Sequence, residues 1–353
     1  MCDTILHNHK TPLVSVAMLA YNHMPYIRQA IDGVLSQKAE FPIELVIGED
    51  CSTDGTREVV FEYGRKFPDT VRVVTSEKNV GMHLNAQRML HACRGKYVAF
   101  CEGDDYFHST QKLQKQVDCF HNEPDCVMVH SNYDLFYVKT KHRIKDALFY
   151  RKDWNDSNAY DEILTGKRYV HTLTVLIKRS ILNSVIRDNP ECTDKKYLLG
   201  DLQMWLEISR LGKVICLPES LATHNMLPES ATHSNNPYRE LNFALSVKEL
   251  IYHYIEKYPC STEVEQTAKS SACLFVLGKS WKANDSSLGK DIYDELCRIR
   301  PRFSPHAFLL YFGGRSAINR IISIPLIHAY LFARRTILEK IYHRLQTRKT
   351  RLQ

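Results

Sequence analysis

The sequence predicts an α/β protein with a mostly parallel sheet that is covered by helices on both faces. Over the first 135 residues, short apolar runs alternate with stretches whose apolar residues recur at helical spacing. The runs are continuously apolar, as strands buried on both faces are. Polar and acidic residues follow several runs, at the strand ends where sheets of this class bind ligands.

The alternating elements can be assigned in chain order. The predicted strands are the apolar runs at Leu13–Ala20, Glu44–Gly48, Val71–Thr75, Tyr97–Cys101 and Cys126–His130. The predicted helices lie between them, at Pro25–Ser36, Arg57–Phe67, His83–Cys93 and Thr110–Phe120. Because each pair of strands is joined through a helix, the units are expected to form parallel pairs.

The second half of the chain is less regular. Asp134–Tyr169 is polar and charged, and we interpret it as a loop-rich excursion. The further predicted elements are a strand at Val170–Lys178, a helix at Leu202–Leu211, short strands at Val214–Leu217 and Leu221–His224 split by Pro218, and helices at Val247–Tyr258, Glu263–Trp281 and Asp291–Ile299. This pattern predicts an α/β domain over residues 1–235, a helical region over 236–314 and a tail over 315–353.

Composition narrows the class of protein. The chain has 353 residues, of which 44% are apolar and 25% charged, which excludes collagenous, disordered and disulfide-scaffold proteins. Its 11 cysteines include no CxxC pair, which argues against a structural zinc site and favours a reducing compartment. No apolar run reaches the ~20 residues of a spanning helix. We therefore expect a cytoplasmic protein.

Charge is concentrated at the carboxyl end. The formal net charge is +7, yet residues 315–353 hold nine Lys and Arg and one acid, so the rest of the chain is nearly neutral. Many apolar residues of this tail fall on one helical face, which predicts a basic amphipathic helix on the inner face of the membrane. A helix packed on the body, a dimer contact or a solvated helix are alternatives. Nucleic acid is not expected, since no binding motif is present.

Acidic residues gather at the predicted strand ends. Asp50 follows the second strand, Glu102, Asp104 and Asp105 follow the fourth, and Asp201 lies farther along the chain. Neighbouring carboxylates repel unless a cation joins them, and Mg²⁺ or Mn²⁺ often bridges such oxygens to a phosphate. A metal–diphosphate site is therefore predicted, with a solvated acidic turn as the alternative. The chain has neither GxxxxGK[ST] nor GxGxxG after its first strand, which argues against P-loop and NAD enzymes.

Four stretches in order resemble family 2 glycosyltransferases of the GT-A fold, over roughly residues 13–235. They are VSVAMLAYNHMPYIRQAIDGVLSQ, ELVIGEDCSTDGT, KNVGMHLNAQRMLHACRGKYVAFCEGDDYF and LLGDLQMWLEISRLGKVICLPESLA. The third is similar to the stretch that contains the family's DxD motif, and the fourth to the segment with the catalytic base.

The resemblance implies a role for each matching residue. The implied nucleotide-sugar-binding residues are Ala20, Tyr21, Asn22, Asp50, Asn79, Gly81, Asn85, Glu102, Gly103, Asp104 and Asp105. Asp50 would contact the base, Asp104 would be the main ligand of a divalent metal (Mg²⁺ or Mn²⁺), and Glu102 would lie on the ribose or metal side. Asp201 would be the general base, and a single displacement would invert the anomeric carbon.

The chain departs from the family pattern at several positions. Glu102 stands where the first Asp is usual, and Gly200 stands where many relatives have Glu. The absence of QxxRW argues against a processive synthase. Substrate contact is a weaker expectation for His171, Thr172 and His224, which could equally be structural residues.

The sequence thus predicts an inverting, metal-dependent transfer of one sugar from a nucleoside diphosphate sugar, with UDP as the expected nucleotide. The expected acceptor is a hydroxyl of a glycan or of a lipid-linked oligosaccharide. The alternative is a non-catalytic sugar-nucleotide-binding scaffold or sensor at the membrane.

Overall fold

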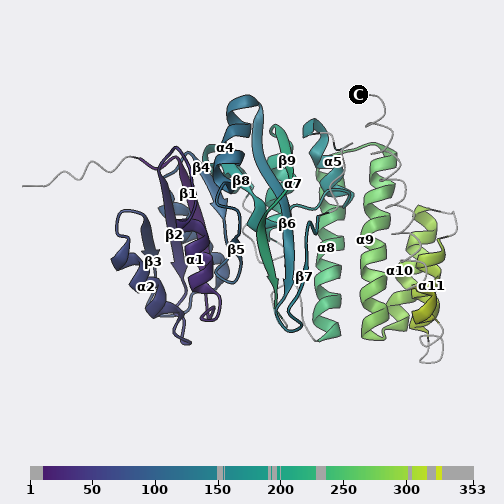
Figure 1. The fold of residues 1–353 in the computed structure, drawn as a ribbon. Helices are drawn as coiled ribbons and strands as arrows, with labels where there is room; N and C mark the ends of the chain where they lie inside the picture. The colour runs from purple at the N-terminus through teal and green to yellow at the C-terminus, as the bar shows by residue number, and fades with distance from the viewer. Residues whose placement is uncertain are drawn as a thin grey trace, which may run out of the picture. The chain divides into compact units, whose positions relative to one another are not determined.

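The structure is a computed structural model of the whole chain (Figure 1). It describes residues 11–148, 154, 156–189, 192, 197–198, 200–227, 236–300, 304–315 and 323–327. The chain divides into two compact units, Met1–Pro228 and Glu229–Gln353. The domain boundary expected after residue 235 stays a prediction, and most of the expected basic tail lies outside the described residues.

The first unit begins with parallel strands joined through helices. The strands are β1 (Val14–Ala20), β2 (Ile43–Glu49), β3 (Val71–Val74) and β4 (Tyr97–Phe100), and they pair in the order β3-β2-β1-β4. The helices are α1 (Ile27–Leu35), α2 (Thr56–Lys66) and α3 (Met82–Ala92). These elements confirm the sequence prediction to within a few residues.

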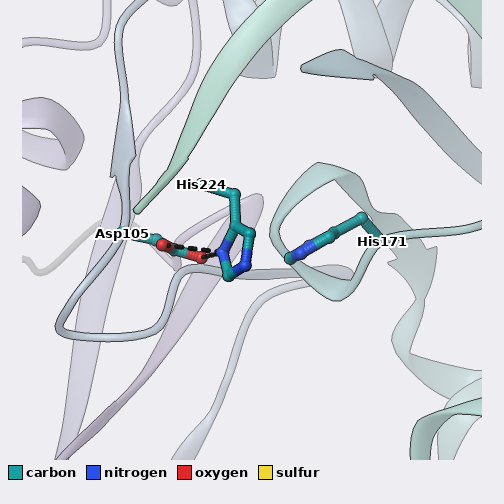
Figure 2. A group of neighbouring side chains, drawn as sticks. All are labelled: Asp105, His171 and His224. Atoms are coloured by element: carbon teal, nitrogen blue, oxygen red, sulfur yellow. Dashed lines mark hydrogen bonds and ion pairs between the residues drawn. The ribbon is translucent and has the colours of Figure 1, made fainter. Parts of the chain in front are cut away.

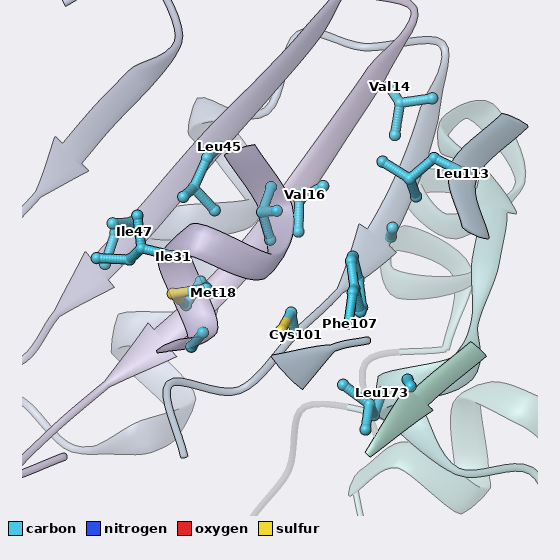
Figure 3. Packing of buried hydrophobic residues seen from close by; sticks show 14 of the residues in the cluster. Val14, Val16, Met18, Ile31, Leu45, Ile47, Cys101, Phe107, Leu113 and Leu173 are labelled. Atoms are coloured by element: carbon cyan, nitrogen blue, oxygen red, sulfur yellow. The ribbon is translucent and has the colours of Figure 1, made fainter. Parts of the chain in front are cut away.

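Alternating side chains divide the strands between two faces. Val14, Val16 and Met18 of β1 lie in one apolar cluster with Leu45 and Ile47 of β2 (Figure 3). The same cluster includes residues of α1, α2 and α4 (Lys112–Asn122), which therefore cover this face.

Helix α3 contacts β1, β2 and β3 from the opposite face. The lack of a side chain at Gly48 permits this approach, because a Cβ there would lie 3.0 Å from Asn85 Oδ1 and 3.1 Å from Met89 Cβ.

The other half of the sheet is mixed. Strand β8 (Leu176–Lys178) is antiparallel to both β4 and β6 (Cys126–Tyr137), and β9 (Lys213–Met226) runs parallel to β6. Strands β5 (Tyr106–Phe107) and β7 (His142–Ile144) add antiparallel edges to β9 and β6. The sheet order is β3-β2-β1-β4-β8-β6-β9-β5, and the predicted α/β class is confirmed.

Two local predictions were wrong. Val170–Lys178 is not one strand, because a 3-10 turn at Thr172–Thr174 (η2) precedes β8. Pro218 does not split β9, because a register shift against β6 accommodates it between Leu217 and Ser220. The stretch Asp134–Tyr169, expected to be loop-rich, also contains the end of β6, all of β7, and α5 (Ala159–Leu164).

Two helices complete the first unit, α6 (Arg179–Asp188) and α7 (Gly200–Ser209). The second unit contains α8 (Pro237–Lys257), α9 (Thr262–Ala283), α10 (Ser286–Ile299) and α11 (Pro305–Gly314) around a core of its own. Their first turns are capped by side chains of Asn236, Ser261, Asp285 and Ser304. In the described part of the chain, we find no helix with the length and apolarity needed to cross a membrane.

A buried polar cluster joins the amino ends of the parallel strands. The Glu44 carboxylate accepts hydrogen bonds from Ser15 Oγ (2.6 Å), Arg94 N (2.7 Å) and Arg94 Nε (2.9 Å). Ser15 Oγ in turn accepts from Gly95 N at 2.8 Å. Burial alone would raise the pKa of Glu44, but the hydrogen bonds from Ser15 and Arg94 outweigh it and lower the pKa.

Replacing Glu44 with Gln is expected to lower the free energy of unfolding by ~1–3 kcal/mol at neutral pH, because buried donors lose a charged acceptor. The lowered pKa in the folded state means that the carboxylate stabilises the fold above its ordinary pKa. This stabilisation is lost as the pH falls through the lowered value. Urea unfolding followed by circular dichroism should show a wild-type advantage that shrinks in acid.

The control is Glu62→Gln, which removes an exposed pair with Arg28 and should change stability little. An equal Glu44→Gln effect at acid and neutral pH would contradict the interpretation.

Candidate active site

Two loops at the carboxyl ends of β1 and β2 are bonded to each other. Asn22, with a left-handed φ of 56°, donates its N–H to Ser52 Oγ (3.1 Å) and accepts from Thr53 N through Oδ1 (3.0 Å). Asparagine tolerates this conformation better than most residues. The predicted pocket residue Tyr21 next to it is exposed, whereas Ala20 is buried at the end of β1. This edge therefore presents a polar loop pair to solvent.

Asp50 organises the loop that precedes α3. Its buried carboxylate accepts hydrogen bonds from Val80 N (2.8 Å) and Gly81 N (3.0 Å), and the Asn79 side chain also accepts from Gly81 N (3.0 Å). The structure thus brings three of the predicted nucleotide-site residues to the end of β2. Contact of Asp50 with a base stays a prediction.

Asn85 is placed differently from this group. Its side chain is buried against β2 and donates to the Gly48 carbonyl at 2.7 Å, so it links α3 to the sheet. Its Oδ1 atom is buried and has no hydrogen-bond partner within the described residues. The nucleotide contact expected for Asn85 remains a prediction.

The acidic turn, residues 102–105, lies directly on the end of β1. Gly103 N donates to the Leu19 carbonyl at 2.9 Å, and Asp105 N donates to the Glu102 carbonyl at 3.0 Å. A Cβ at Gly103 would lie 2.7 Å from His23 Nδ1 and 3.0 Å from the Leu19 oxygen. Only glycine therefore permits the turn to sit this close to β1.

The carboxyl groups of the turn are crowded and poorly solvated. Burial, followed by the neighbouring charges of Asp105 and Asp104, raises the pKa of Glu102 to about 8. Its Oε2 atom is buried without a hydrogen-bond partner among the residues that the structure describes. An unpartnered carboxylate oxygen beside two further carboxyls fits a hard divalent cation, so Glu102 and Asp104 are suitable candidate ligands.

Asp105 is held by residues that come 119 and 120 positions later. Its carboxylate contacts His224 Nδ1 at 2.9 and 3.0 Å and accepts from Asn225 N at 2.8 Å. Burial raises the pKa of Asp105 despite these partners. Burial lowers the pKa of the His224 imidazole, but the Asp105 carboxylate more than offsets this and raises it.

The imidazole of His171 lies beside that of His224, on the side away from Asp105 (Figure 2), with 4.4 Å between ring centroids. Burial holds the pKa of His171 well below its usual range. One ligand atom from each of Asp105, His171 and His224 lies within 4.8 Å of the others, so these three could also contribute to binding a metal. An imidazole oriented by a carboxylate is a common arrangement around metals.

The predicted base, Asp201, lies in the first turn of α7. Its Oδ2 accepts from Thr172 Oγ1 at 2.8 Å, and its Oδ1 accepts from Leu202 N at 2.8 Å. Burial raises the pKa of Asp201, while the hydrogen bond from Thr172 lowers it in part. The exposed Tyr169 lies beside His171, with 6.1 Å between ring centroids.

Buried hydrogen bonds from α4 hold the turn that contains Thr172. Gln116 on α4 donates its amide to the carbonyls of Thr174 (2.7 Å) and Val129 (3.2 Å). The fully buried Lys112 donates to the Gln116 oxygen at 2.7 Å. Sequence reasoning missed Gln116 and Asn225 as residues that support the site, and gave only weak weight to Thr172 and His224.

Several known proteins are similar to this chain. Residues 15–185 match the family model described as Glycosyl transferase family 2. The teichuronic acid biosynthesis glycosyltransferase TuaG of Bacillus subtilis is 30% identical over 220 residues, which is 62% of this chain and 81% of TuaG. The chain belongs to glycosyltransferase family 2. This confirms the family resemblance seen in the sequence.

Other relatives match over a smaller share of their length. An uncharacterized protein of Mycobacterium tuberculosis is 30% identical over 63% of this chain, and the match spans 61% of that protein. Among solved structures, S. aureus TarS residues 1–349 with UDP-GlcNAc superpose with a TM-score of 0.57 at 15% identity, covering 91% of this chain and 92% of the other.

A second solved structure is the mannosyltransferase PcManGT from Pyrobaculum calidifontis, in complex with GDP-Man and Mn²⁺. It gives a TM-score of 0.54 at 17% identity, over 92% of this chain and 86% of the other. At these identities the two structures show a shared fold, and they agree with the GT-A architecture expected from the sequence.

Replacing Gly103 with Ala is expected to lower the free energy of unfolding by ~1–3 kcal/mol, since the new Cβ would force β1 or His23 to move. The control is Gly278→Ala in α9, where a Cβ meets nothing within 4 Å. That change should stabilise the protein by roughly 0.5–1 kcal/mol through helix propensity. Urea unfolding of both variants measures these changes in the free energy of unfolding. Equal effects of the two substitutions would disprove the close approach at Gly103.

Proposed function

We propose that the protein is an inverting, metal-dependent glycosyltransferase. It would move one sugar from a nucleoside diphosphate sugar, with UDP as the expected nucleotide, to a hydroxyl of a glycan or lipid-linked oligosaccharide. The observation that carries the proposal is the acidic turn at a strand end. There a buried Glu102 oxygen, which has no partner in the described part of the chain, lies beside Asp104 and Asp105.

The donor site is proposed at the ends of β1 and β2. The polar loops around Asn22 and the loop held by Asp50 lie at this edge, and Tyr21 and Asn79 are exposed there. Parallel α/β sheets bind nucleotides in this position. The complexes of TarS with UDP-GlcNAc and of PcManGT with GDP-Man support a nucleotide sugar as the donor class.

The metal site is proposed at Asp104 and Glu102. Burial and then the neighbouring carboxyls raise the pKa of Glu102, and a bound cation would favour its ionised form; PcManGT is known with Mn²⁺. A bound Mg²⁺ or Mn²⁺ would supply Lewis-acid stabilisation of the negative charge on the departing diphosphate. Asp105 would keep its own role of orienting His224 toward the site.

Asp201 is proposed as the general base. Its raised pKa makes it a better proton acceptor than a solvated aspartate, provided that it is ionised at the working pH. It would take the proton of the acceptor hydroxyl while the oxygen forms the new bond to the anomeric carbon. The bond to the diphosphate breaks on the opposite side, so the configuration inverts.

The acceptor and the location are also proposals. TuaG is named for teichuronic acid biosynthesis, which supports a role in assembling a bacterial polysaccharide. The concentration of basic residues from Arg315 onward supports a cytoplasmic protein that is peripheral at the inner face of the membrane.

Two isosteric variants should separate the metal site from the base. Asp201→Asn should lower turnover by about a hundredfold or more, because the base is lost, and leave donor binding nearly unchanged. Asp104→Asn should instead weaken nucleotide binding in Mn²⁺. Calorimetry with UDP and Mn²⁺, together with release of free sugar from a panel of nucleotide sugars, measures both effects.

The matched control is Asp118→Asn, an exposed aspartate on α4. It should change neither turnover nor nucleotide binding. Near-normal turnover of Asp201→Asn would remove the base assignment, and equal nucleotide binding by Asp104→Asn with and without metal would remove the metal assignment.

Thr172→Val should move the acid limb of the activity profile to higher pH. The substitution removes the hydrogen bond that lowers the pKa of Asp201 and leaves the burial that raises it, so the pKa rises further. The carboxylate then forms only at a higher pH. The pH dependence of donor hydrolysis measures the shift, and Thr172→Ser should restore the wild-type profile. An unmoved acid limb in Thr172→Val would show that this bond does not tune the base.

A further inference from the structure

The β6–β7 hairpin extends from the strands that surround the candidate active site. Strand β6 runs parallel to β9 in a register that puts Leu135 beside His224. Beyond that pair, β6 continues to Tyr137, turns, and returns as β7. On β9, the residue before His224 pairs with Tyr106, which directly follows the acidic turn. The hairpin is therefore joined to the strands on both sides of the Asp105–His224 contact.

Alternating residues give the hairpin two different faces. On one face the buried Tyr133 contacts His171, with 4.9 Å between ring centroids. Farther along, the half-buried Tyr137 lies near the exposed His142 at 6.2 Å, and these two rings form the accessible part of this aromatic face. Sugar rings commonly bind against aromatic side chains in such positions, since both surfaces are partly apolar.

The other face is basic and is anchored to β5, the strand that directly follows the acidic turn. Arg143 donates to the hydroxyl of Tyr106 (2.7 Å) and to Asp134 Oδ2 (3.2 Å), and it lies over the ring of Phe136. Asp134 also accepts from Ser220 Oγ at 2.6 Å. The charge of Arg143 is thus matched by Asp134 and serves to hold the hairpin in place.

The three other cations of the hairpin have no matching carboxylate among the described residues. Residues 138–146 contain four Lys and Arg and a single acid, Asp146. Lys139, Lys141 and Lys145 are all exposed, and the described residues place no carboxylate within ion-pair distance of any of them. Lys141 lies near the Phe136 ring and has a left-handed φ of 55°, a conformation that favours glycine or asparagine. The turn thus has a lysine at a position that disfavours it.

We propose that the β6–β7 hairpin is an acceptor-recognition arm and that the acceptor is an anionic glycan. Its sugar rings lie along the aromatic face, and its phosphate or carboxylate groups lie against Lys139, Lys141 and Lys145. This inference rests on the proposed function, because it assigns the acceptor of that same site. Complementary charge of this kind increases the association rate and excludes neutral competitors.

The charge of the hairpin itself favours an anionic acceptor over a neutral one. Arg143 is paired with Asp134, and the three exposed lysines of residues 138–146 then stand against a single acid, Asp146. A neutral acceptor would gain nothing from them.

The test uses the full-length protein and a fluorescent hyaluronan oligosaccharide, whose uronates provide the charge, with a maltooligosaccharide of equal length as the neutral probe. Fluorescence anisotropy should show binding of the charged probe that weakens as salt is added. The variant Lys139→Gln, Lys141→Gln, Lys145→Gln should bind it about tenfold more weakly, as expected when a few exposed charge pairs are removed together.

Two further variants make the result specific. Replacing the same three lysines with arginine should keep the affinity, and replacing Lys66, Lys78 and Lys96, which are also exposed, with glutamine should leave it unchanged. Circular dichroism confirms that each variant folds. Equal losses in the two glutamine variants, or equal wild-type affinity for the charged and neutral probes, would overturn the proposal.

A membrane role is tested in the same series. Loss of binding to phosphatidylglycerol vesicles by the hairpin variant, with hyaluronan binding retained, would assign the lysines to a lipid surface and overturn the proposal. Donor hydrolysis by the wild-type protein is measured alongside. Its presence together with equal binding of the charged and neutral probes would refute the anionic acceptor while the proposed glycosyl transfer stands.

Discussion

The placement of carboxyl groups in a poorly solvated turn is the constraint on which the site depends. Glu102, Asp104 and Asp105 lie within four residues, and burial, followed by the charges of neighbouring carboxyls, disfavours the ionisation of Glu102 and Asp105. The fold reduces this cost for one carboxyl through His224 and Asn225, which come from the far end of the other half of the sheet. Strand β9 must therefore pair correctly with β5 and β6 before the turn is stable.

The three acidic centres consequently have different chemistry. Asp105 is satisfied by an imidazole and a backbone N–H, so it acts as a structural charge. Glu102 keeps a buried oxygen that has no partner among the described residues, which leaves it available to a cation. Asp201 is separate from both and receives one hydrogen bond from Thr172, which tempers the effect of burial on its pKa. Burial raises the pKa of all three carboxyls, so it is their different partners that suit them to different roles.

The parts of the fold that follow from local patterns could be predicted from the sequence. The apolar runs before Tyr21 and Glu102 identified β1 and β4. Because sheets of this class bind ligands at the carboxyl ends of their strands, the acidic turn could then be located. The parts that depend on long-range pairing could not. The contact between Asp105 and His224 spans 119 residues and requires the register of β9. Val170–Lys178 has the composition of a strand, but a hydrogen bond from the Gln116 amide to the Thr174 carbonyl helps to hold its middle as a turn.

The position of the hairpin also depends on long-range pairing, so it could not be predicted from the sequence. As a sequence, residues 138–146 are a polar stretch with many lysines, which solvation alone would explain. Their pairing with β6 joins them to Tyr106 and so to the acidic turn. A surface charge acts mainly within a Debye length, about 8 Å at physiological ionic strength, so its position decides its effect. Cations on a hairpin that extends from the site change the field that an incoming acceptor meets, whereas the same lysines elsewhere would serve solubility.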